Sequence, residues 1–167
     1  MKKIITFTLI LLLGLCFITG CGKDNDDYDS DDGRQDGPKT PSVTVNPGSV
    51  IFDNNVVKIV YKKVELDSTS MDIYYEVTNK SNDDIYVQHG EIIYNGNITN
   101  TTGIGQHNFY AGKTDESVIL MYVSTIKNQA GILPEEIKTV QVTFTVNRYG
   151  TTDTLFEGTA LLNIVLP

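Results

Sequence analysis

The chain has 167 residues, with 13 basic and 21 acidic side chains and a formal net charge of −8. This acidic balance argues against a nucleic-acid partner and against electrostatic docking on anionic lipid, because both depend on basic surface patches. Cys16 lies in an apolar run that processing should remove, so Cys21 alone would remain. A single cysteine excludes an internal disulfide and a cysteine-ligated zinc or iron–sulfur site.

Residues 1–20 have the features of a lipoprotein signal peptide. Two lysines precede a mostly apolar stretch at 4–18, whose 15 residues suit a signal peptide and are few for a membrane-spanning helix. The order of a bacterial lipobox follows, with an aliphatic residue, two small residues and the cysteine that takes the lipid: Ile18, Thr19, Gly20 and Cys21. We expect a lipid anchor on Cys21 at the extracytoplasmic face of the cell membrane, and ordinary secretion with a free cysteine is the alternative.

Residues 21–49 combine the lipidated cysteine with an acidic segment rich in Gly, Ser, Thr and Pro. Its aspartates do not fit a calcium-binding EF-hand, because alignment on Gly33 places Tyr28 and Lys39 where the loop needs acidic ligands. A segment with so few apolar residues cannot offset its ordering entropy, so we expect a disordered tether. Loss of Lys2 and Lys3 on processing would leave 11 basic against 21 acidic side chains, a net charge of −10.

Residues 50–167 alternate apolar and polar side chains between turn signals, which predicts a β-rich domain. A short strand is predicted at 50–53. The next, at 56–66, changes apolar phase by one residue, which predicts a bulge near Lys62 and Lys63. The cleanest alternation is at 71–79, where alternate residues from Met71 to Val77 face one way.

Further strands are predicted along the rest of the chain. One at 85–94 is broken at Gly90 and stopped by Asn95-Gly96, a strong hairpin signal. Residues 117–124 are continuously apolar, as expected for a central strand covered on both faces. The remaining elements are a short strand at 108–111, a helical turn at 132–137, and strands at 139–148 and 154–166. Seven or eight strands with almost no helix favour an immunoglobulin-like antiparallel β-sandwich, an all-β fold, over residues 50–167.

The stretch "YYEVTNKSNDDIYV" places Val77, Asn79, Ser81 and Asn82 between two strands, and "AGKTDES" precedes a later one. With the lipobox and the acidic tether, this pattern resembles small surface lipoproteins of Gram-positive bacteria. Their C-terminal immunoglobulin-like domain has an unknown function and is related in fold to a mycobacterial immunoprotective antigen. The resemblance implies an immunoglobulin-like fold and brings no catalytic residue. Asn79 and Ser81 suit a turn because their side chains can bond to their own backbone.

No sequence pattern of a catalytic or cofactor site is present, including GxSxG, HExxH, a P-loop and GxGxxG. We therefore expect a protein that is not an enzyme and has no cofactor or bound metal. His89 and His107 both lie near glycines in polar segments, and we expect them in exposed loops. A metal site would need both to meet a carboxylate such as Glu91.

Two surfaces are candidates for ligand binding. Tyr74, Tyr86 and Gln88 are predicted at outward positions on neighbouring strands, where exposed aromatic rings can bind sugars, peptides or proteins. A cross-strand pair that supports the sheet is the alternative for the two tyrosines. The long polar loop that contains Gly103 and His107 is the other candidate.

The sequence thus favours a non-catalytic, lipid-anchored binding module with a protein or carbohydrate partner at the cell envelope. An accessory protein for a transporter or cell-wall enzyme, or an inhibitor of secreted proteases, are the alternatives.

Overall fold

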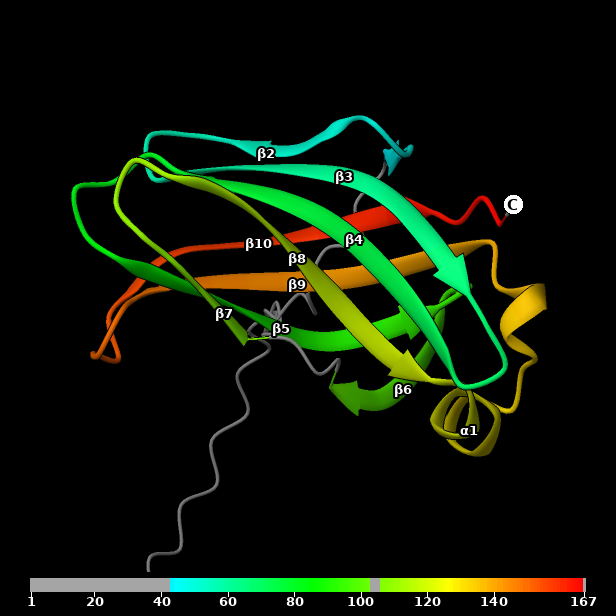
Figure 1. The fold of residues 1–167 in the computed structure, drawn as a ribbon. Coiled ribbons are helices and arrows are strands. Elements are labelled where there is room, and N and C mark those ends of the chain that lie inside the picture. Colours follow the sequence, from blue (N-terminus) through cyan, green and yellow to red (C-terminus); the bar gives the residue numbers. More distant parts are fainter. Residues whose placement is uncertain (1–42, 103–105, 167) are drawn as a thin grey trace, which may run out of the picture. The chain divides into compact units, whose positions relative to one another are not determined.

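The computed structural model describes residues 43–102 and 106–166, which form two packed β-sheets (Figure 1). The predicted lipobox residues Ile18, Thr19, Gly20 and Cys21, together with Gly103, lie outside the described residues. None of the helices in 43–102 and 106–166 has the length and apolar character needed to cross a membrane.

The first sheet is antiparallel and has the strand order β2-β3-β4-β8. Its strands are β2 (Val50–Asp53), β3 (Val57–Leu66), β4 (Ser70–Asn79) and β8 (Thr114–Tyr122). The predicted bulge is present, because the register between β3 and β4 shifts between Tyr61 and Lys63.

The second sheet has the order β1-β10-β9-β5, and both β6 and β7 pair with the remaining edge of β5. Strand β1 runs parallel to β10, whereas the other pairs are antiparallel. These strands are β1 (Thr44–Val45), β5 (Ile85–Tyr94), β6 (Asn97–Thr102), β7 (Gln106–Phe109), β9 (Thr139–Arg148) and β10 (Thr154–Asn163).

This connectivity is that of an immunoglobulin-like sandwich. Strands β3, β4 and β8 occupy the positions of strands A, B and E in an immunoglobulin domain, and β5, β9 and β10 occupy those of C, F and G. The predicted fold class is therefore confirmed, with ten strands among the described residues rather than seven or eight.

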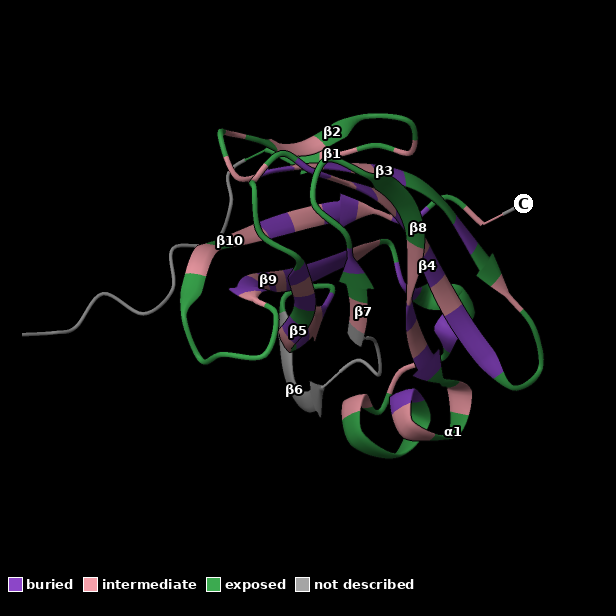
Figure 2. Ribbon diagram, turned by 60° about the vertical axis from the view of Figure 1, so that its left-hand side comes forward, coloured by how far each residue is buried: buried purple, intermediate pink, exposed green. Residues whose placement is uncertain are grey.

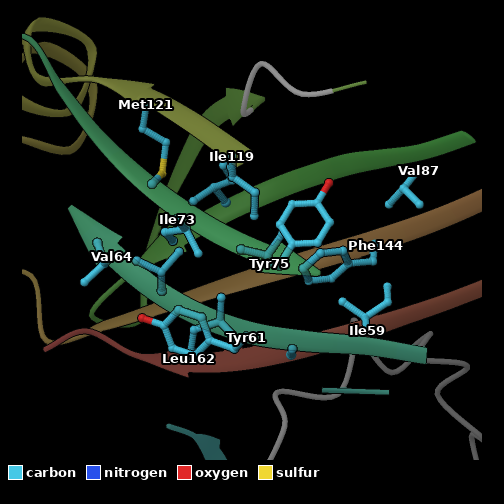
Figure 3. Packing of buried hydrophobic residues seen from close by; sticks show 14 of the residues in the cluster. Ile59, Tyr61, Val64, Ile73, Tyr75, Val87, Ile119, Met121, Phe144 and Leu162 are labelled. Atoms are coloured by element: carbon cyan, nitrogen blue, oxygen red, sulfur yellow. The ribbon is translucent and has the colours of Figure 1, made fainter. Parts of the chain in front are cut away.

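The core lies between the sheets and follows from the period-two alternation of their strands (Figure 2). The inward residues of β4 and β9 are fully buried: Met71, Ile73, Tyr75, Val77, Val140, Val142, Phe144 and Val146. Figure 3 shows the Tyr75 ring beside Phe144, and their centroids lie 5.5 Å apart with an edge-to-face angle of 80°. Such contacts add to area burial in holding one sheet against the other.

The domain begins earlier than the predicted boundary at residue 50. Thr44 and Val45 pair with Leu161 and Leu162 of β10, and the Gly48 amide donates to the Tyr61 carbonyl at 2.7 Å. The last residues assigned to the tether therefore belong to the sandwich.

Strand β8 is an edge of the first sheet, so the prediction of a central strand was wrong. Ile119 and Met121 face the core, whereas Val118 and Leu120 are only half-buried on the outer face. After β8 the chain turns through α1 (Val123–Thr125) and η1 (Ile126–Ala130), which were not predicted. The expected helical turn is η2 (Pro134–Glu136), with proline at its first position.

His89 is buried, which contradicts the expectation of an exposed loop histidine. Strand β5 continues through Gly90, and the register with β9 shifts between His89 and Ile92, so Gly90 lies at a bulge rather than a break. His89 consequently keeps the inward phase of Val87 and is 7% exposed. Its ring stands edge-to-face to Tyr75 and to Phe144, with both centroid distances 5.3 Å.

Candidate functional site

The residues predicted as one tyrosine surface are not brought together. Tyr74 lies on β4 in the first sheet and Tyr86 on β5 in the second, so they cannot form a cross-strand pair. The Lys63 ammonium lies 4.7 Å from the Tyr74 ring centroid as a cation–π contact. Partial burial raises the pKa of Tyr74, and the nearby Glu65 carboxylate acts in the same direction.

Tyr86 and Gln88 share the outer face of the second sheet with their neighbours on β9. The Tyr86 hydroxyl donates to the Thr151 carbonyl at 3.5 Å, and the Asn147 side chain donates to Gln88 Oε1 at 3.4 Å. These contacts are within the sheet and its turn.

His107 links the two sheets instead of forming part of an open loop. It lies on β7, where its ring centroid is 4.8 Å from that of Phe109, and its Nε2 is 3.4 Å from a carboxylate oxygen of Asp115 on β8. His107 and buried His89 therefore have different surroundings and do not form a metal site. Among the described residues, no group of three or more His, Cys, Asp or Glu side chains is placed to hold a metal ion.

A different site is built where the β4–β5, β7–β8 and β9–β10 connections meet, on the left of Figure 1. We call this the loop end, and it comprises residues 80–84, 110–113 and 149–153. In an immunoglobulin sandwich, loops at the ends of the sheets are positioned by a rigid core, which suits them to binding.

Asn79 holds the first two of these connections together. Its side-chain amide is fully buried and donates to the Asp83 carbonyl at 2.8 Å and to the Phe109 carbonyl at 3.0 Å. Its Oδ1 accepts from the Ser81 amide at 2.9 Å, which confirms the predicted turn in which Asn79 and Ser81 bond to the local backbone.

Asp84 ties all three connections to one residue. Its backbone carbonyl accepts from the Tyr149 amide at 2.8 Å, and its carboxylate Oδ1 accepts from the Ala111 amide at 2.9 Å. The backbones that carry Tyr110 and Tyr149 are therefore fixed relative to each other without needing a ligand to order them.

Ion pairs surround this arrangement. Arg148 donates through Nε to Asp83 at 3.1 Å and through Nη1 to Asp153 at 3.2 Å. Lys80 pairs with Asp53, and its hydrogen bond lowers the pKa of that carboxyl. Pairs this exposed contribute little to stability, but they give the Lys80 and Arg148 side chains carboxylate partners.

The loop end contains a hollow of about 90 Å³. It is lined by Asp84, Asn108, Phe109, Tyr110 and Tyr149. Tyr110 and Tyr149 are 69% and 55% exposed, which is high for tyrosine, a residue that usually buries much of its ring. The site is thus a small depression with one carboxylate and two accessible aromatic rings.

The sequence interpretation missed Tyr110 and Tyr149 because they lie 39 positions apart, Tyr110 in a predicted short strand and Tyr149 between two later strands. A signal was present, since each stands one or two residues before a glycine, in "YAG" and "YG". Both glycines adopt positive φ, +67° at Gly112 and +75° at Gly150, which marks the two segments as tight turns. At both turns the tyrosine side chain is more than half exposed.

Comparison with known proteins adds little to this description. No family model matches the chain, and no curated protein matches it. Among solved structures, the chain is similar to Bacteroides uniformis β-glucuronidase 2, with 15% sequence identity and a TM-score of 0.39. The match covers 65% of this chain and spans only 13% of that enzyme. A likeness at this level leaves the site to be interpreted from its own geometry.

Proposed function

We propose that the protein is a lipid-anchored, extracytoplasmic lipoprotein that presents a non-catalytic β-sandwich as a binding module, with the loop end as its binding surface. The observation that carries the proposal is the double use of Asp84, which fixes two exposed tyrosines beside one hollow. A preformed surface loses less entropy on binding than one that must be ordered by its ligand.

The anchor is supported by the agreement of three sequence features: a basic start, a short apolar stretch and the "ITGC" lipobox. The resemblance to Gram-positive surface lipoproteins favours the same location. Acyl chains contribute about 0.8 kcal/mol per buried methylene, so two or more of them hold a protein firmly on a bilayer.

The anchor and the module are tested separately on the full chain. Cys21→Ser should move the protein from the membrane fraction to the soluble fraction, and equal retention of this variant in the membrane would contradict lipidation.

For binding, the full chain in detergent is applied to protein and glycan arrays as the native sequence, as Tyr149→Ala and as Tyr122→Ala. Tyr122 is a matched control, because it is 48% exposed and pairs with Ser70 at the other end of the sandwich. We expect a ligand that is lost in Tyr149→Ala and kept in Tyr122→Ala. Ligands bound equally by both variants, or no ligand at all, would refute the assignment of the loop end.

A further inference from the structure

We propose that the hollow at the loop end receives the ammonium group of a lysine side chain from a partner protein. This inference rests on the proposed function and names the chemistry of its ligand.

The charges around the hollow favour a ligand with a cationic group. Arg148 is shared by Asp83 and Asp153, and Lys80 is taken by Asp53, whereas Lys113 makes no ion pair among the described residues. None of the ion pairs among the described residues includes Asp84, the one charged residue of the lining. The Asp84 carboxylate is held in place by the Ala111 amide, a neutral donor, so its negative charge is oriented but not neutralised.

The aromatic rings favour the same ligand. Tyrosine faces attract cations through the ring quadrupole, and recognition of an ammonium by several aromatic side chains is a recurring arrangement. Tyr110 and Tyr149 both line the hollow and are both more than half exposed, so their rings are open to a group that enters from solvent.

The size of the hollow favours the head group of a side chain over a whole sugar ring. A buried cavity of about 150 Å³ holds one benzene ring. At about 90 Å³ the hollow at Asp84 is smaller than such a cavity. It has room for an ammonium and the methylene that bears it.

Lysine suits the carboxylate better than arginine does. A guanidinium binds most strongly when both carboxylate oxygens accept in parallel, but Oδ1 of Asp84 already accepts from the Ala111 amide. An ammonium is a compact point charge and needs only one free oxygen.

The test is a titration of the isotope-labelled full chain in detergent with Nα-acetyl-lysine methylamide, followed through the backbone amide signals of Ala111 and Tyr149. Both amides bond to Asp84, so they report on the hollow. We expect saturable shifts in the millimolar range, a loss of affinity of at least tenfold in Asp84→Asn and in Tyr149→Ala, and unchanged binding in Tyr122→Ala. Asp84→Asn keeps an oxygen for the Ala111 amide and removes only the charge.

Two further probes separate the outcomes. The Nε-acetylated analogue has no charge, and equal binding of it would overturn the proposal, as would unchanged binding in Asp84→Asn. If the arginine analogue or glucosamine binds more tightly than the lysine analogue, the assignment of lysine as the ligand is wrong. If an array ligand depends on Tyr149 while the lysine analogue does not bind, the binding module stands and the lysine assignment falls.

Discussion

Gly158 is the position at which one added methyl group tests the packing between the two sheets. It lies on β10 opposite Phe144, and a Cβ there would lie 2.7 Å from Cζ of Phe156 and 2.8 Å from Cε1 of Phe52. Separations below 3.0 Å cannot be accommodated without movement of the rings. Phe52 comes from β2 of the other sheet and packs edge-to-face on Phe144 and Phe156, with centroid distances of 5.8 and 5.1 Å.

The expected cost of Gly158→Ala is the difference of two effects. Overpacking a core by one methyl group costs about 1–3 kcal/mol, because rings and backbone must shift. Replacing glycine also reduces the conformational entropy of the unfolded chain, which stabilises the folded state by about 0.4–1 kcal/mol. We therefore expect a net loss of about 1–2 kcal/mol in the free energy of unfolding, measured by urea denaturation. The midpoint of thermal unfolding should fall by several degrees.

Gly90→Ala is the matched control for this measurement. Gly90 also lies in a strand of the second sheet, but a Cβ there would meet nothing closer than Thr143 Cβ at 3.4 Å, an ordinary contact. We expect this variant to be as stable as the native chain or slightly more stable. Removing the nearest ring atom with Phe156→Leu should reduce the cost of Gly158→Ala in a double-mutant cycle. Equal stability of Gly158→Ala and Gly90→Ala would refute the packing described for Phe52.

Three other outcomes follow from the structure. Asn79→Asp removes both buried donors and places a carboxylate against two carbonyls, so it should cost at least about 3 kcal/mol in urea denaturation. Asn54→Asp should be nearly neutral, because the Asn54 side chain only accepts, through Oδ1, from the Val56 and Val57 amides. Burial raises the pKa of Tyr61 to about 12. The contribution of its neutral hydroxyl to the free energy of unfolding is therefore fully present below pH 10. From pH 10 to 12 that stability should fall by up to about 1.4 kcal/mol per pH unit, and a Tyr61→Phe variant with an equally steep alkaline limb would contradict this. Asp84→Ala should speed hydrogen exchange at the Ala111 amide, whereas Asp84→Asn should not; equal rates would show that the Asp84–Ala111 bond does not hold the loop.

The strands could be predicted where one face is buried and the other is solvated. Residues 71–79 show this most clearly, since the alternation of β4 reflects the two faces of the first sheet. The slip in apolar phase at Lys62 and Lys63 was also a physical signal, because an extra residue in one strand reverses the faces that follow it.

The neighbours of each strand could not be predicted in the same way. Apolar periodicity records that a side chain is buried and does not record which strand covers it. The apolar run of β8 therefore suggested a central strand, although β8 is an edge with half-buried Val118 and Leu120 on its outer face. Tyr74 and Tyr86 were placed side by side because their strands are consecutive, but the chain crosses to the other sheet between them.

His89 shows where a residue-type rule overrode a stronger pattern. It occupies the next alternate position after Ile85 and Val87, and this phase alone would have placed it inside. The site at the loop end could not be predicted from local sequence patterns. Asp84, Tyr110 and Tyr149 come from three separate connections, and only the immunoglobulin-like strand order brings those connections to one end.

The same strand order relates the loop end to the point where the chain enters the domain. Strand β10 starts at Thr154, just after the turn that carries Tyr149, and β1 pairs in parallel near its far end, with Thr44 opposite Leu161. Seven residues at roughly 3.3 Å each separate Thr154 from Leu161 by roughly 23 Å. Thr44 therefore lies at the end of the sandwich opposite Tyr110 and Tyr149.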